Sequence, residues 1–156
     1  MDALDFIQQD HDRFRALLDR YEEIDPDDHA TKREVIDELI AAVVRHSAME
    51  EEAFYPVVMR DVPHVEEDIR EEIEEHHVIE VVMAELDGLD ATHEQFDAKV
   101  EVLAENLLHH LYEEEDELFP RVRSAFDDDA LARLLDGLRT AKERAPSRPD
   151  PDRVGG

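Results

Sequence analysis

The sequence predicts an all-α protein, an up-down-up-down four-helix bundle with a short fifth C-terminal helix. Apolar residues recur every three or four positions along four long stretches, as expected for helices with one buried face. Glycine is rare, with 4 in 156 residues, so the chain has few helix breakers. The long stretches are joined by short turns, which favour antiparallel neighbours.

The first two predicted helices span residues 2–24 and 30–60. Pro56 falls inside the second helix, where we expect a kink or a tightened turn because proline lacks an N–H donor. Tyr55 lies nine positions after His46, about half a turn around a regular helix. We therefore expect Tyr55 to point away from the face that carries His46.

The third predicted helix follows the break at residues 61–63 and ends near Gly88. The fourth begins after a cap at Asp90 or Thr92 and carries Pro120 in its last turns.

A short fifth helix is predicted after Phe126, with four leucines on one side, and should pack on the outside of the bundle. Residues 145–156 are rich in Pro, Asp and Gly and predict a disordered tail. The sequence thus indicates one domain over residues 1–144, with its core in residues 1–126.

The net charge, the absence of Cys and the lack of long apolar runs exclude several classes of partner and of metal site. The formal net charge of −27 makes nucleic acid and anionic membranes poor partners, since both attract basic surfaces. There is no Cys, so any metal site must use His and carboxylate ligands. No apolar run approaches 18 residues and the acidic start lacks a signal-peptide pattern, which predicts a cytoplasmic protein. A protein partner is not predictable from the sequence.

One pattern occurs twice, as His46-x-x-x-Glu50 and as His110-x-x-x-Glu114, each followed by an aromatic residue and a Pro. Residues four apart lie on one face of a helix, so each copy directs an imidazole and a carboxylate to the same point. Because 44 of the 156 residues are acidic, this spacing alone is weak support for a metal site.

The helical phase of these pairs is more informative than their spacing. Both pairs lie in the middle of a buried apolar stripe, whereas His109 and Glu113 lie about 100° around the helix and are expected to be solvated. A carboxylate in a core costs several kcal/mol, roughly, unless a cation compensates it.

The other two long helices also place a His in their buried stripes. These are His11 in the first and His76 in the third, where His76 fits the stripe better than its neighbour His77. Glu80, four residues after His76, is a further possible ligand. The predicted metal ligands are therefore His11, His46, Glu50, His76, His110 and Glu114.

A set of four imidazoles and two carboxylates without sulfur suits iron, manganese or zinc. Two glutamates that can bridge favour two metal ions, and open coordination positions would then bind a small ligand. No separate catalytic residue and no organic cofactor site is predicted.

The pattern resembles the hemerythrin-like family, also called the HHE cation-binding domain, over about residues 1–126. The matching motifs are Asp10-His11, His46-x-x-x-Glu50, Tyr55-Pro56, Glu75-His76, His110-x-x-x-Glu114 and Phe119-Pro120. The resemblance implies a non-haem di-iron centre, oxo- or hydroxo-bridged and bridged also by the two glutamates. It further implies a small ligand such as O₂, NO or peroxide.

One position departs from the family pattern. Hemerythrins carry two His four apart on the third helix, and the second place is Glu80 in this chain. A carboxylate there would favour the ferric state, so the sequence favours sensing, iron handling or redox chemistry over reversible O₂ carriage.

Three alternatives remain beside a ligand-binding di-iron protein. A redox enzyme could consume peroxide or NO or act like a ferroxidase, but a ferritin-like site needs two Glu-x-x-His pairs, and only Glu74-x-x-His77 fits. A zinc hydrolase would need a His-Glu-x-x-His motif, which the sequence lacks. A metal-free helical interaction module is the structural alternative.

Overall fold

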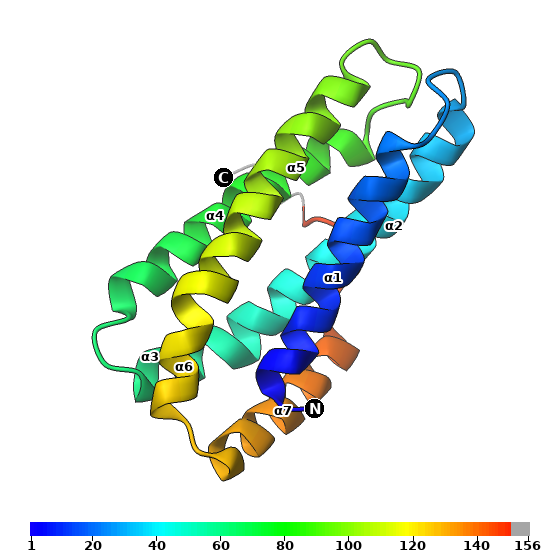
Figure 1. Ribbon diagram of the computed structural model, residues 1–156. Coiled ribbons are helices and arrows are strands. Elements are labelled where there is room, and N and C mark those ends of the chain that lie inside the picture. Colours follow the sequence, from blue (N-terminus) through cyan, green and yellow to red (C-terminus); the bar gives the residue numbers. More distant parts are fainter. Residues whose placement is uncertain (151–156) are drawn as a thin grey trace.

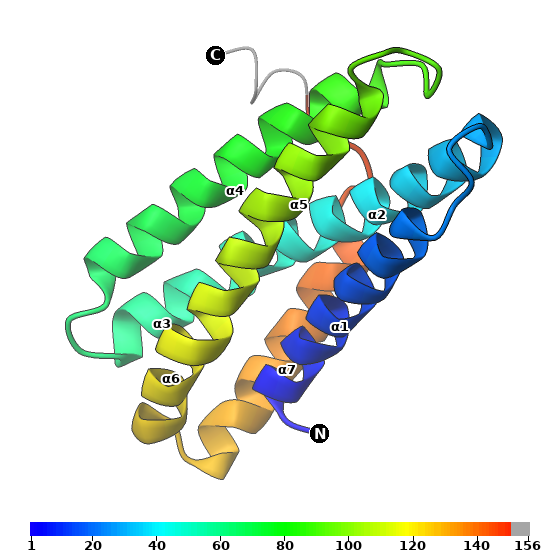
Figure 2. The same cartoon turned by 45° about the horizontal axis from the view of Figure 1, so that its top comes forward.

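Four long helical rods lie antiparallel to their neighbours in the computed structural model, which describes residues 1–150 (Figures 1 and 2). The rods are α1 (Ala3–Glu22), α2 (His29–Met49) with η1 (Glu50–Phe54) and α3 (Tyr55–Asp61), α4 (Glu66–Asp87), and α5 (Phe96–Glu113) with η2 (Glu114–Leu118) and α6 (Phe119–Ala125). A shorter helix, α7 (Asp128–Arg144), completes the described chain, and residues 1–150 contain no strand. The predicted fold class is confirmed.

Short acidic residues start three of these helices. Asp2 and Asp5 form a reciprocal capping box at the beginning of α1, at N–H to carboxylate distances of 2.9 and 3.0 Å. Asp28 caps α2 and Asp127 caps α7 through single side-chain bonds to backbone N–H groups.

We expected a kink or a tightened turn at Pro56, but the turn before Pro56 is widened, as is the turn before Pro120. Each proline follows a π-helical turn, η1 or η2, in which the chain is widened. The N–H of Tyr55 bonds to the carbonyl of Glu50, five residues back, and Phe119 does the same to Glu114. The wider turn relieves the clash and the missing hydrogen bond that a proline brings to a regular helix.

Two hydrophobic clusters fill the interior, one on each side of a polar layer. The first joins the start of α1 to α3, α6 and α7, and includes Leu4, Phe54, Val122 and Leu138. The second lies toward the other end of the bundle and includes Phe14, Leu39, Met83 and Leu103. The buried His and Glu side chains of the chain lie between them.

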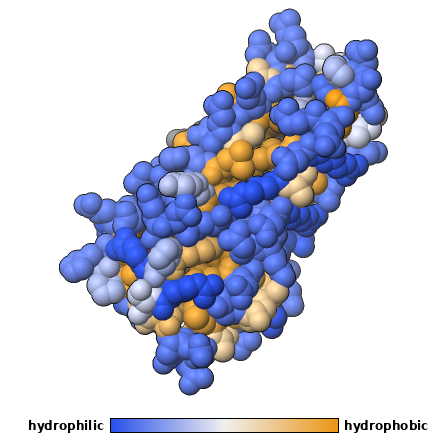
Figure 3. All heavy atoms as spheres, in the orientation of Figure 1, coloured by the Kyte–Doolittle hydropathy of each residue, from blue (hydrophilic) through white to orange (hydrophobic). Residues whose placement is uncertain are grey.

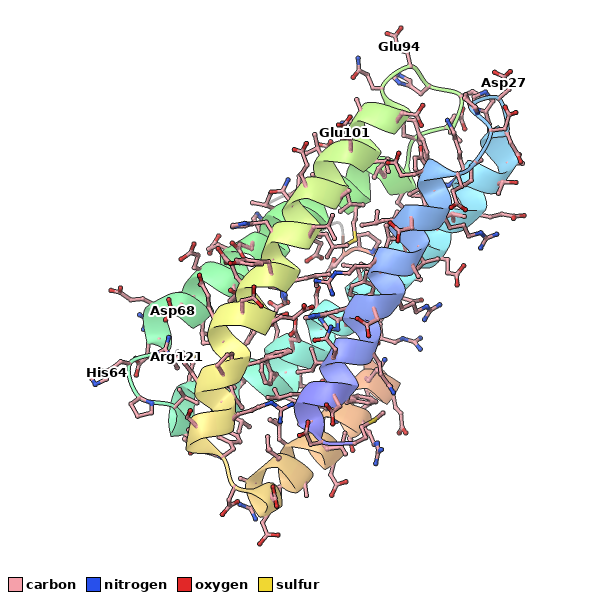
Figure 4. All side chains as sticks on the ribbon, viewed as in Figure 1. Asp27, His64, Asp68, Glu94, Glu101 and Arg121 are labelled. Carbon is pink, nitrogen blue, oxygen red and sulfur yellow. The ribbon has the colours of Figure 1, made fainter. Side chains whose placement is uncertain are left out.

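The turn between α3 and α4 is held by Arg121 of α6 (Figure 4). Its guanidinium donates to the carbonyl of His64 at 2.7 Å and to Asp68 at 2.6 Å. His64 has a positive φ of 58°, a left-handed conformation that non-glycine residues adopt rarely. Arg121 thus links α6 to α4 and to the turn between α3 and α4 at this end of the bundle.

Helix α7 packs on α1, α2 and η1 rather than continuing the four-helix layer (Figure 2). The disordered tail was predicted from residue 145, and the structure describes residues 145–150 of it. There Pro149 is buried and the Asp150 N–H donates to Glu80 at 3.4 Å. Residues 151–156, the rest of that prediction, lie outside the described residues.

The surface is mainly hydrophilic on the face shown in Figure 3, and apolar side chains show chiefly between α1 and α5. Within residues 1–150, the search for a helix both long and apolar enough to cross a lipid bilayer found none.

Candidate metal centre

The six side chains that the sequence predicts as ligands meet in the polar layer of the bundle. All six are at most 3% exposed: His11, His46, Glu50, His76, His110 and Glu114. His76 is buried whereas His77 is exposed, so α4 presents His76 to the interior. Both glutamates are the first residues of the π-helical turns.

The ligand atoms form two adjacent groups that share Glu50. His11, His46, Glu50 and Glu114 make the first group, with one atom from each lying within 4.8 Å of the others. Glu50, His76 and His110 make the second.

The closest contacts run from imidazole nitrogens to the two glutamates. Glu50 Oε1 lies 3.1 Å from His46 Nε2 and 3.2 Å from His76 Nε2. Glu114 Oε1 lies 3.2 Å from His11 Nε2 and 3.3 Å from His110 Nε2. Each glutamate therefore touches a His of either group, which is the arrangement that a bridging carboxylate requires.

Several of these inward atoms are buried without a hydrogen-bond partner among the described residues. They are His11 Nε2, His46 Nε2, Glu50 Oε2 and Glu114 Oε1. An unsatisfied buried polar atom costs about 1–3 kcal/mol, and charged groups cost more. Four such atoms around one point fit a bound cation, which would accept all of them as ligands.

The opposite ring nitrogen of each His meets a carboxylate from a neighbouring helix. Asp10 of α1 lies 2.8 Å from His46 Nδ1 of α2, and Glu51 of η1 lies 3.3 Å from His76 Nδ1 of α4. These contacts fix the ring orientation and the tautomer that presents Nε2 inward.

Two further contacts close this pattern into a ring around the bundle. Glu75 of α4 lies 3.1 Å from His110 Nδ1 of α5, and Glu115 of η2 lies 2.6 Å from His11 Nδ1 of α1. Each helix thus supports the His of the next. Every supporting acid directly precedes or follows a ligand in the sequence, and this adjacency could have identified them.

Two of the four supporting acids are themselves held by cationic side chains. Lys142 of α7 lies 2.6 Å from Asp10, and Arg15 donates to both oxygens of Glu115 at 2.8 and 3.1 Å. Although burial raises the pKa of Glu115, His11 and Arg15 outweigh it and lower that pKa to about 2.

Electrostatics couple the imidazoles to the carboxylates. Burial lowers the pKa of His46, but Glu50 and Asp10 outweigh it and raise that pKa to about 10. The pKa values of His11 and His110 are also raised, because Glu114 outweighs burial at both. Without an ion, protons on these rings neutralise the carboxylates, so a metal ion must displace them.

Tyr55 lies inside the site, contrary to the half-turn expectation. Its hydroxyl is 3.1 Å from Glu114 Oε2, 3.1 Å from His76 Nε2 and 3.3 Å from Glu50 Oε1. The π-helical turn acts as one inserted residue, which rotates all later side chains by about 100°. Periodicity alone could not locate that insertion.

Glu80, the further possible ligand, is 7% exposed and is not in a group of ligand-type atoms within 4.8 Å of one another among the described residues. It lines a cavity of about 90 Å³ together with His76, Glu51 and Met83. That volume is well below the roughly 300–1,000 Å³ of sites for larger organic ligands.

The comparisons with known proteins agree with this geometry. The family described as Hemerythrin HHE cation binding domain matches residues 2–122. A crystal structure of a Hemerythrin HHE cation binding domain-containing protein from Mycobacterium kansasii superposes with a TM-score of 0.78 at 17% identity, covering 92% of this chain and 86% of the other. A search of curated proteins gave no match. The chain belongs to the hemerythrin HHE cation-binding domain family.

Proposed function

We propose that the chain is a di-iron protein that binds a small ligand such as O₂, NO or peroxide. The orphaned inward atoms of His11, His46, Glu50 and Glu114 carry this proposal, because a cation is the partner that satisfies all of them together. His11 and His46 would hold one ion, and His76 and His110 the other. Glu50 and Glu114 would bridge them, and Mn or Zn could take the same N/O ligands.

The cavity beside His76 favours a small ligand. Its volume of about 90 Å³ admits a few heavy atoms, and His76 provides an adjoining wall. Iron would supply the redox chemistry, while the chain's residues bind, orient and exclude bulk water. Glu80 in that wall adds negative charge, which favours the ferric state and disfavours reversible O₂ carriage.

The metal-free interaction module is less well supported by the contacts. It would leave four buried polar atoms at the centre of the fold without a well-directed hydrogen bond, held only by close imidazole–carboxylate contacts, and it gives no reason for the ring of supporting acids.

Metal analysis of protein purified without added metal, with its near-UV and visible spectrum, tests the proposal. We expect about two irons per chain and the charge-transfer absorption of a di-iron centre. Addition of O₂, NO or peroxide to the reduced protein then identifies the ligand. Protein that is metal-free and takes up no Fe²⁺ under anaerobic conditions would overturn the proposal. Repeated reversible O₂ binding would contradict the inference that Glu80 disfavours O₂ carriage.

A further inference from the structure

A second group of ligand-type side chains lies on the outside of α4 and α5. One atom each from Glu75, His109 and Glu113 lies within 4.8 Å of the other two. His109 Nε2 is 2.8 Å from Glu113 Oε1 and 3.7 Å from Glu75 Oε2. The His109 side chain is 63% exposed, so an ion can reach this group from solvent.

No Lys or Arg side chain pairs with the carboxylates of this group within residues 1–150. The carboxyl groups of Glu75 and Glu113 contact each other, and within residues 1–150 their ion-pair partners are imidazoles. Two of the other supporting acids differ, since Lys142 holds Asp10 and Arg15 holds Glu115. In a chain of net charge −27, a divalent cation is a natural partner for a carboxylate pair that no Lys or Arg neutralises.

Glu75 joins this outer group to the inner site. One of its oxygens lies 3.7 Å from His109 Nε2 on the outside, and the other lies 3.1 Å from His110 Nδ1 on the inside. The same side chain therefore contacts the outer group and a predicted inner ligand.

Glu72 supplies a position between the two groups. It is 5% exposed, and together with His110 and Glu114 it forms a further group of atoms within 4.8 Å. Its Oε2 atom is 2.7 Å from His110 Nδ1 but makes no well-directed hydrogen bond with the described residues. Glu72 and Glu113 also line one pocket of about 60 Å³. Candidate ligands thus continue from Glu113 through Glu72 to Glu114.

We propose that Glu75, His109 and Glu113 form a capture site for a divalent cation such as Fe²⁺, and that Glu72 passes the ion to the inner centre. Carboxylate and imidazole ligands suit Fe²⁺, Mn²⁺, Co²⁺ and Zn²⁺. The passage to the centre rests on the proposed function, whereas capture at the surface does not.

Anaerobic Co²⁺ binding to the metal-free protein tests both parts. Equilibrium dialysis counts the bound ions, and stopped-flow absorbance follows the loading of the inner site. The test variant is His109→Gln with Glu113→Gln, and Glu113→Gln alone serves as the milder variant. The matched control is His77→Gln with Glu101→Gln, at exposed positions of the same helices; Figure 4 shows Glu101 on the outer side of α5.

We expect the test variant to bind one Co²⁺ fewer than the parent and to load the inner site about tenfold more slowly at low Co²⁺. Its final inner-site spectrum and circular dichroism should match those of the parent and the control. Equal ion counts and equal loading rates in the test variant and parent would overturn the proposal. The parent protein could also show no inner-site spectrum while the test variant still binds one Co²⁺ fewer. That result would support capture at the surface and refute the di-metal centre.

Discussion

The Oε1 atom of Glu50 faces three imidazole rings. It lies 3.1 Å from His46 Nε2, 3.2 Å from His76 Nε2 and 3.8 Å from His110 Nε2. Burial would raise the pKa of Glu50, but His46 and the other neighbouring groups outweigh burial and hold it well below the usual value. An ionised carboxylate in this place is therefore available to a cation, and in the proposed di-iron centre it would serve both ions.

Glu50→Gln should lower metal affinity at both positions, because the neutral amide removes the shared charge. Loss of a supporting acid typically weakens metal binding about 10–100-fold, so we expect a loss of about 100-fold or more here. Metal content after dialysis against a weak chelator measures the effect. Glu52→Gln is the control, since Glu52 is half-exposed and pairs with Arg144 away from the centre. Retention of two ions by Glu50→Gln would show that Glu50 is not a bridge.

The Tyr55 hydroxyl touches both glutamates and His76, whereas its ring belongs to the apolar cluster that contains Phe54. Burial and then Glu114 and Glu50 raise the pKa of Tyr55 well above its usual value, so the hydroxyl keeps its proton and can donate it in a hydrogen bond.

Tyr55→Phe should therefore keep the fold and the two ions but change the visible spectrum and the rate of reaction with peroxide or NO. Tyr21→Phe is the matched control, because the Tyr21 hydroxyl donates to Asp97 far from the centre. Metal analysis, absorbance and stopped-flow kinetics compare the two variants. Identical spectra and rates in parent and Tyr55→Phe would exclude a role for the hydroxyl.

The sequence could predict the six inward side chains because each occupies a regular helical position in an apolar stripe. Tyr55 was missed because the extra residue of η1 changes the helical phase after Glu50. The same shift buries Val58 while Val57 remains partly exposed, although the regular stripe favours Val57. The supporting acids each lie beside a predicted ligand in the sequence, but the His that each one supports was not predictable, since it belongs to a different helix and pairing between helices requires the fold.

At the scale of elements, α7 has a connection to the centre that its leucine stripe does not predict. Lys142, in its last turn, reaches Asp10 of α1 at 2.6 Å, and Asp10 in turn contacts His46 of α2. Burial raises the pKa of Asp10, but His46 and Lys142 outweigh it and lower the pKa below its usual value. Helix α7 thus supports the predicted ligand His46 as well as covering the core.

Lys142→Met should weaken metal binding about tenfold, in the range found for residues that orient a metal-bound His. Methionine removes the ammonium that lies 5.0 Å from the centroid of the Phe6 ring but keeps an unbranched side chain that can pack on that ring, so a loss of packing should be small. Lys99→Met is the control, because Lys99 pairs with Glu85 on the surface at 2.6 Å. Competition against a coloured chelator measures both affinities, and equal values would refute the connection through Asp10.

At the scale of the whole molecule, the candidate metal centre makes folding stability depend on pH. The direction of this dependence should differ between the metal-free and the metal-loaded protein. In the metal-free protein the pKa of His46 is raised to about 10, above its value of about 6.5 in an unfolded chain. The stability this provides is fully present below about pH 6.5 and is lost as pH rises toward 10. Glu72 acts in the same direction, because burial raises its pKa to about 8 and its ionisation is unfavourable in the folded protein, so folding stability decreases between about pH 4.5 and 8.

The metal-loaded protein should respond in the opposite direction. An imidazole must lose its proton to ligate, so protons compete with the ion, and the stability that the ion adds decreases on acidification. The melting temperature of the loaded protein minus that of the metal-free protein should therefore grow as pH rises from about 5 to 9. We expect a change of about 5 °C or more, which corresponds to roughly 1–2 kcal/mol in a domain of this size.

The difference between the two melting temperatures isolates the effect of the metal centre on stability from the effects of the other charged groups. The net charge of −27 also lowers stability as pH rises, through general repulsion, but it acts on both forms and largely cancels. Calorimetry of both forms in the same buffers, with excess metal for the loaded form, gives the two curves. Because each displaced proton is released on binding, proton release measured by titration should account for the slope of the difference. A difference that stays constant across this pH range would mean that the ion does not replace protons on the buried imidazoles.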